Sequence, residues 1–73
     1  MGGNPIDEHI GNRVQLARAM AGMEREGLAS ALEITPDEIL AYERGESRIS
    51  AAALFAIAAV LRKPIGFFYE GLG

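Results

Sequence analysis

The chain has 73 residues, 49% of them hydrophobic, which predicts a single small folded domain over residues 1–73 with one modest core. Its lack of cysteine excludes disulfides, thiolate metal sites and cysteine nucleophiles, and it fits the reducing cytoplasm. The formal net charge of −3 counts against nucleic-acid binding, because DNA-binding domains usually carry a basic surface.

The first predicted helix covers about residues 8–21. Asp7 precedes it as the expected N-cap, because an aspartate side chain can accept hydrogen bonds from the free amide groups of the first turn. Apolar residues follow at helical spacing, namely Ile10, Val14, Ala17 and Met20 or Ala21. Gly22 is expected to end the helix in a left-handed conformation.

Two short helices joined by a tight turn are predicted over about residues 25–44. The first of them covers about residues 25–32. The second begins at Thr35-Pro36-Asp37-Glu38, which places threonine at the cap, proline at the first helical position and glutamate three residues after the cap. Gly45 is expected to end it. The residues expected to face inward are Leu28, Ala29, Leu32, Ile39 and Tyr42.

Two further elements are predicted after Ser50 and Pro64. Ser50 is expected to cap a helix over about residues 51–62, and Pro64 separates that helix from a short fifth element over about residues 65–69. The core stripe of the longer helix is expected to be Leu54, Ile57, Ala58 and Leu61. Small residues give the same helix a smooth face that another helix could approach closely, although helix propensity explains them equally well: Ala51, Ala52, Ala53, Ala56 and Ala59.

These residues, taken in order, resemble the Cro/CI-type (Xre family) helix-turn-helix domain of small single-domain bacterial regulators. The resemblance covers about residues 5–72 and is carried by Asn4-Pro5-Ile6-Asp7, Arg13 and Arg18, Leu28-Ala29, Leu32, Tyr42-Glu43-Arg44-Gly45, Arg48-Ile49-Ser50, Pro64-Ile65 and Phe67-Phe68. It implies an all-α, compact five-helix, lambda-repressor-like domain. It also implies that an arginine of the first helix pairs with a glutamate near the end of the third, which maps onto Arg18 and Glu43 as a structural ion pair.

The resemblance further implies a transcriptional regulator that binds double-stranded DNA as a homodimer. The third helix would be the recognition helix in the major groove, with Pro36, Asp37, Glu38, Leu40 and Ala41 at the base-contacting positions. Contacts to the DNA backbone would come from Arg13, Arg25, Arg44 and Arg48.

The recognition positions depart from the family pattern, because none of them offers a side-chain hydrogen-bond donor to a base edge. Residues 24–48 hold seven acidic residues and three arginines, a formal charge of −4, so this surface would bind a polyanion weakly. Glu33 occupies a turn position where the family usually has a left-handed glycine, a misfit of about 1 kcal/mol. A second function therefore stays open: a relaxed helix-turn-helix that acts as a protein-interaction module, for dimerisation or for control of another helix-turn-helix regulator.

The C-terminal aromatic segment is the candidate dimer or partner surface. Four apolar side chains within six residues cannot all turn inward from a short element: Phe67, Phe68, Tyr69 and Leu72. No enzyme signature is present, since there is no nucleophile with a nearby base and no phosphate-binding glycine loop. His9 is the only histidine, so neither a metal site nor a cofactor is expected. The longest apolar run, residues 51–61, is too short to span a bilayer, and a cytoplasmic location is expected.

Overall fold

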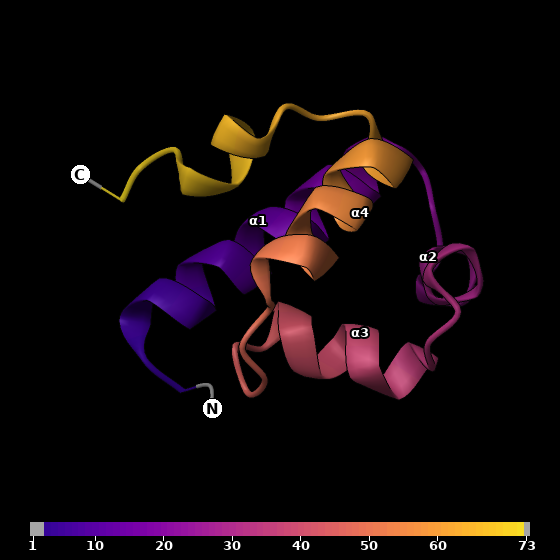
Figure 1. The fold of residues 1–73 in the computed structure, drawn as a ribbon, viewed down its shortest axis with the longest axis horizontal. Helices are drawn as coiled ribbons and strands as arrows, with labels where there is room; N and C mark the ends of the chain where they lie inside the picture. The colour runs from indigo at the N-terminus through magenta and orange to yellow at the C-terminus, as the bar shows by residue number, and fades with distance from the viewer. Residues whose placement is uncertain (1–2, 73) are drawn as a thin grey trace.

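Four α-helices and one short 3-10 helix form the fold in this computed structural model, which describes residues 3–72 (Figure 1). In chain order the elements are α1 (Pro5–Met20), α2 (Arg25–Leu32), α3 (Pro36–Glu43), α4 (Ala51–Leu61) and η1 (Ile65–Tyr69). The predicted all-α class is confirmed, but the fifth element is a 3-10 helix rather than a fifth α-helix. Residues 1, 2 and 73 of the expected domain lie outside the described residues. No helix within residues 3–72 is long and apolar enough to cross a membrane.

α1 begins three residues earlier than the sequence predicts. Asn4 is its N-cap, and the Asn4 Oδ1 atom accepts a hydrogen bond from the backbone N–H of Asp7 at 2.8 Å. Pro5 takes the first helical position, where a missing N–H has no intrahelical partner to lose. The prediction that Asp7 caps this helix was therefore wrong, because Asp7 already lies within the first turn. The predicted end is confirmed by Gly22, whose φ is +65°.

The turn between α2 and α3 is closed by Glu33 in a left-handed conformation, with φ +60° and ψ +39°. A Cβ atom crowds the next carbonyl oxygen in this conformation, so the misfit expected at Glu33 is present. The predicted start of α3 is confirmed, because Thr35 Oγ1 accepts a hydrogen bond from the Glu38 N–H at 3.2 Å. Gly45 follows α3 with φ +73°, as predicted.

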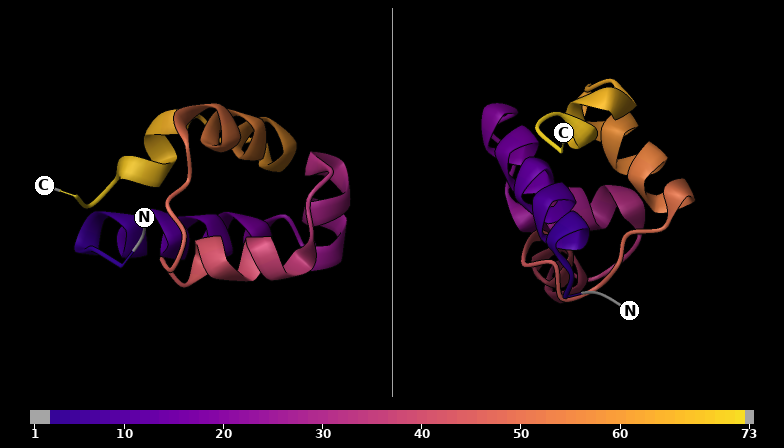
Figure 2. Two further views of the ribbon diagram at one scale, coloured as in Figure 1. Left: turned by 60° about the horizontal axis from the view of Figure 1, so that its bottom comes forward. Right: turned by 90° about the vertical axis from the view of Figure 1, so that its left-hand side faces the viewer.

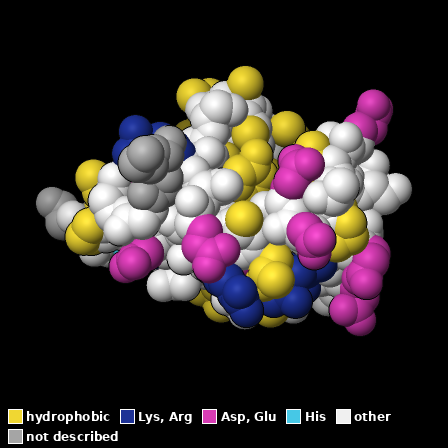
Figure 3. All heavy atoms as spheres, turned by 90° about the horizontal axis from the view of Figure 1, so that it is seen from below, with side chains coloured by type: hydrophobic (Ala, Val, Ile, Leu, Met, Phe, Trp, Pro, Cys, Tyr) yellow, Lys and Arg dark blue, Asp and Glu magenta, His cyan; other side chains and the backbone are white. Residues whose placement is uncertain are grey.

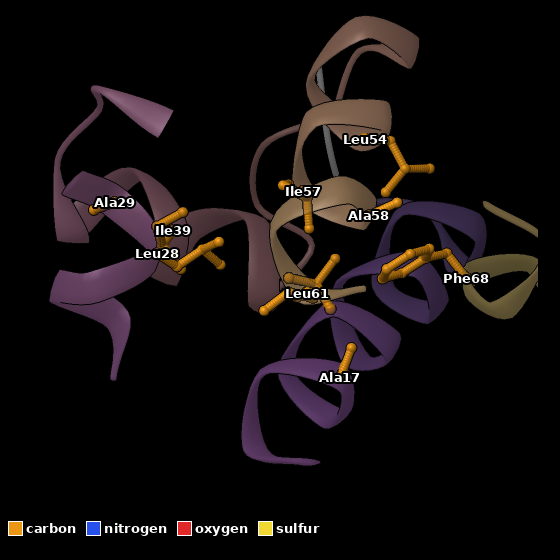
Figure 4. Close-up of a cluster of buried hydrophobic side chains, with 10 residues drawn as sticks. Ala17, Leu28, Ala29, Ile39, Leu54, Ile57, Ala58, Leu61 and Phe68 are labelled. Carbon is orange, nitrogen blue, oxygen red and sulfur yellow. The ribbon is translucent and has the colours of Figure 1, made fainter. Parts of the chain in front are cut away.

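The core lies between the helices, with the buried side chains of α2 and α3 on one side and those of α1, α4 and η1 on the other (Figure 4). Its buried apolar residues are Val14, Ala17, Leu28, Ala29, Ile39, Leu54, Ile57, Ala58, Leu61 and Phe68. The stripe predicted for α4 is confirmed, since all four of its residues belong to this set. Ser50 caps α4 as predicted, with its Oγ atom accepting a hydrogen bond from the Ala53 N–H at 3.1 Å. Phe68 reaches from η1 toward α1 and α4 and is fully buried (Figure 4).

α1 and α3 lie alongside each other, and their backbones approach closely at Gly11 (Figure 2). A Cβ atom at Gly11 would lie 2.2 Å from the backbone oxygen of Tyr42 and 2.8 Å from that of Glu43. Only glycine permits such an approach. This contact fixes α3 against α1 and so determines which side of α3 faces solvent.

Candidate nucleic-acid interface

The five residues at the predicted recognition positions lie along the first two turns of α3. Pro36, Asp37 and Glu38 are exposed, whereas Leu40 and Ala41 are half-buried. The two carboxylates lie at the helix N-terminus, where the partial positive charge of the helix dipole stabilises them. The exposed side of α3 therefore presents carboxylates and hydrocarbon to any ligand.

The opposite side of α3 ends at Glu43, whose side chain is only 1% exposed and is held by two arginines. Arg18 donates from Nε to Glu43 Oε2 at 2.6 Å and from Nη2 to Oε1 at 3.4 Å. Arg25 donates from Nε to Glu43 Oε1 at 2.9 Å. The structure thus brings together the two residues named for the structural ion pair and adds Arg25, which sequence reasoning did not place there. The remaining hydrogen bond of this cluster runs from Arg18 Nη1 to the carbonyl oxygen of Met23 at 2.8 Å.

Arg13, one of the four arginines expected to hold phosphates, is engaged elsewhere in the fold. Its Nε donates to the carbonyl oxygen of Phe67 at 2.9 Å, and its Nη2 donates to the carboxylate of Glu70 at 2.8 Å. The guanidinium carbon also lies 3.9 Å from the centroid of the Phe67 ring, within the range of a cation–π contact. Arg13 therefore ties η1 to α1, and we remove it from the set of candidate phosphate contacts.

The other three arginines differ in side-chain exposure and in whether they form an ion pair within the fold. They are Arg25, Arg44 and Arg48. The Arg48 side chain is 57% exposed, with its Nε 3.3 Å from Oδ1 of the buried Asp7. The Arg25 side chain is 38% exposed, and its contact with Glu43 uses only Nε. Arg44 follows the last residue of α3, is exposed, and forms no ion pair within residues 3–72. Seen from the α3 side, basic side chains gather around an apolar patch while acidic side chains surround them (Figure 3).

A groove of about 300 Å³ opens between α2 and α3 beside the predicted recognition positions. Its lining residues are Arg18, Glu24, Arg25, Glu26, Pro36, Asp37 and Leu40. Both arginines of this set are already bonded to Glu43, whereas Glu24, Glu26 and Asp37 form no ion pair within the described part of the chain. Three unmatched carboxylates therefore set the charge that a ligand in this groove would meet.

The residues of the predicted partner surface divide between the core and the exterior. Phe68 is 0% exposed, so its assignment to an exposed surface was wrong. In a 3-10 helix residues three apart share one side, and Ile65 and Phe68 both turn toward the core. Phe67 is half-buried beneath Arg13, while Tyr69 is 47% and Leu72 is 40% exposed.

Comparisons with known proteins agree with this architecture. A family model described as helix-turn-helix matches residues 14–68. An uncharacterized HTH-type transcriptional regulator of Sinorhizobium medicae is 45% identical over 67 residues, which are 92% of this chain and 48% of that protein. The chain thus spans about half the length of that relative.

Solved structures give the same fold in different settings. The clp gene regulator ClgR from C. glutamicum has a TM-score of 0.86 at 22% identity, over 92% of this chain and 87% of that one. A crystal structure of iron(II) HppE in complex with substrate has a TM-score of 0.79 at 30% identity. The match covers 85% of this chain but only 36% of the HppE chain.

Proposed function

This chain belongs to the Cro/CI-type helix-turn-helix family, and from that membership we propose that it is a DNA-binding transcriptional regulator whose α3 enters the major groove. The observation that carries the proposal is the exposed, uncommitted Arg44 directly after α3. Arg25 and Arg48 retain donors for phosphate, because each ion pair described for them uses only Nε. Relatives named as transcriptional regulators support the same function.

The proposed binding is led by the DNA backbone rather than by the bases. Arg25, Arg44 and Arg48 would each neutralise a phosphate, so the logarithm of affinity should fall with the logarithm of salt at a slope of about −3 for each bound copy of the chain. Asp37 and Glu38 oppose this attraction, and base discrimination is left to hydrocarbon contacts. Leu40 and Ala41 can meet the methyl group of thymine, which is the one apolar feature of the major groove.

Removing the Arg44 charge tests this function directly. We expect Arg44→Gln to weaken binding to mixed-sequence duplex DNA and to flatten the salt slope by about 1 for each bound copy, measured by fluorescence anisotropy across a salt series. Arg62→Gln is the matched control, because it removes the same charge from an exposed residue that follows α4 near Met20 and Met23. Equal losses in both variants, or an absence of binding at low salt, would contradict a DNA-binding α3.

The acidic groove between α2 and α3 favours a second candidate function, a protein-interaction module. Glu24, Glu26 and Asp37 would receive a basic segment of a partner protein, such as another helix-turn-helix regulator, and Leu40 would supply an apolar contact. A lysine- and arginine-rich peptide should then bind the wild-type chain and lose affinity in Asp37→Asn, while duplex DNA fails to bind. Neither proposed function uses a catalytic residue or a cofactor. We propose a cytoplasmic location for the chain in both cases.

A further inference from the structure

α4 has an exposed side without a single polar side chain. Its exposed residues are Ala51, Ala52, Phe55, Ala56 and Ala59. Phe55 is 61% exposed, the highest value among the large exposed hydrophobic residues between residues 3 and 72. Covering a ring of this size would remove a large apolar area from water, so the residue is a strong anchor for an interface.

An apolar recess of about 100 Å³ adjoins this side of α4. Leu32 lines it from the end of α2 and Ile34 lines it from the α2–α3 turn. Tyr42 lines it from α3, and Ala53 and Ala56 line it from α4. In the view from the α3 side, apolar side chains gather between the upper edge of the molecule and its centre (Figure 3). The projecting Phe55 ring and this hollow therefore belong to one surface, because Ala56 is adjacent to both.

We propose that this surface, the α4 surface, is an interface between two copies of the chain, in which Phe55 of each copy enters the recess of the other. An isologous contact uses the same patch on both copies, so a group that projects from the patch needs its matching hollow on that patch as well. The α4 surface supplies both. The inference concerns assembly and does not rest on DNA binding.

The net charge of the chain bears on where two copies can meet. Each copy carries a net charge of −3, so two copies repel each other and approach at least cost where no ionisable side chain intervenes. The exposed side of α4 meets that condition between residues 51 and 61.

The size of the surface also bears on how the copies would meet. A stable interface takes about 800 Å² from each partner, of which one aromatic ring supplies about 150–250 Å². The contact must therefore extend from α4 to the end of α2 and the α2–α3 turn, where Leu32 and Ile34 line the recess and the exposed Glu33 lies between them. The small side chains beside Phe55 would let the two copies approach closely enough to make that contact.

Sedimentation velocity at high micromolar concentration tests the α4 surface against the C-terminal one. We expect the wild type to be dimeric, Phe55→Glu to weaken the dimer by at least about tenfold, and Tyr69→Glu to leave it intact. Both residues are exposed, so circular dichroism should show unchanged helix content in each variant. A monomeric wild type, a Phe55→Glu variant that stays dimeric, or dissociation by Tyr69→Glu alone would overturn the proposal.

Disulfide trapping gives an independent result, because the chain has no cysteine of its own. Under mild oxidation, Ala56→Cys chains, which keep the Phe55 ring, should form a linked homodimer several times faster than Tyr69→Cys chains, because Ala56 lines the recess that the Phe55 ring enters. Equal rates of linkage in the two variants would overturn the proposed contact.

Discussion

The buried and exposed sides of α3 differ in whether their carboxylates form ion pairs with arginines. On the buried side Glu43 is held by Arg18 and Arg25, whereas Asp37 and Glu38 on the exposed side form no ion pair within residues 3–72. A buried carboxylate needs such partners, because an unpaired charge away from water is very costly. An exposed carboxylate is solvated and imposes no such requirement. The charges that hold α3 in place are thus constrained by the fold, while those it shows to a ligand are free to change.

Removing the carboxylate on the buried side of α3 should have the largest effect on stability. We expect Glu43→Ala to lower the free energy of unfolding by about 3–5 kcal/mol, because it leaves Arg18 and Arg25 without their shared partner. Urea unfolding followed by circular dichroism measures this loss. The exposed Glu46→Ala variant should stay within about 0.5 kcal/mol of the wild type.

A double-mutant cycle would show whether the cluster acts as a unit. Arg18→Ala should also destabilise the fold, and the Arg18→Ala/Glu43→Ala variant should be less unstable than the sum of the two single variants. Additivity within a few tenths of a kcal/mol would mean that the two side chains do not stabilise each other in solution.

The close backbone contact at Gly11 supports the buried side of α3. Gly11→Ala should lower stability by about 1–3 kcal/mol or more, because its Cβ would overlap the backbone oxygen of Tyr42 and push α3 away from α1. Gly27→Ala is the matched control. Its Cβ would meet only the flexible Met23 side chain at 3.3 Å, so helix propensity should raise stability by up to about 1 kcal/mol. Thermal unfolding that shifts both variants in the same direction would contradict this contrast.

Substitutions on the exposed side of α3 should change the affinity for duplex DNA rather than the stability of the fold. Asp37→Gln combined with Glu38→Gln removes two negative charges and supplies amide donors of the kind that pair with adenine, so duplex affinity should rise several-fold at low salt. The corresponding double alanine variant separates the two causes, because it removes the charges without adding donors. If the glutamine variant binds DNA no more tightly than the wild type, α3 does not face the duplex in the way proposed.

The smallest effect is expected at the turn before α3. Glu33→Gly should raise stability by about 0.5 kcal/mol, because glycine adopts φ +60° without crowding but loses more entropy on folding. Ser30→Gly, at an exposed position inside α2, should instead lose up to about 1 kcal/mol. Chemical denaturation of both variants checks the opposite signs, and a loss in Glu33→Gly would show that its left-handed backbone carries no strain.

Features whose partners lie a few residues away were predictable from the sequence. Thr35 and Ser50 each cap a helix through an N–H three residues later, and Gly45 needs only its own backbone conformation. The start of α1 was misplaced because Asn4 and Asp7 are both good caps. Pro5 distinguishes them, since proline is favoured at the first helical position after a cap.

Features that join distant parts of the chain were not predictable from spacing. Arg25 joins Glu43 across 18 residues, and Arg13 reaches Phe67 across 54, so nothing local tells a phosphate-binding arginine from a structural one. Gly11 gave one usable signal, because a glycine inside a helical pattern indicates a close packing contact. Whether Phe67 or Phe68 enters the core depends on which side of η1 faces α1 and α4, and the sequence pattern does not indicate that side.

The close approach at Gly11 also governs how a mechanical disturbance would travel through the domain. α1 is a stiff rod of 16 residues that touches the α3 backbone at Gly11 and holds η1 through Arg13, two positions later. No flexible side chain separates α1 from α3 at this point, so α3 cannot tilt without α1. A pull on the segment after η1 would therefore turn α3 together with α1, and in the proposed DNA complex it would change the angle at which α3 meets the duplex while leaving the shape of α3 unchanged.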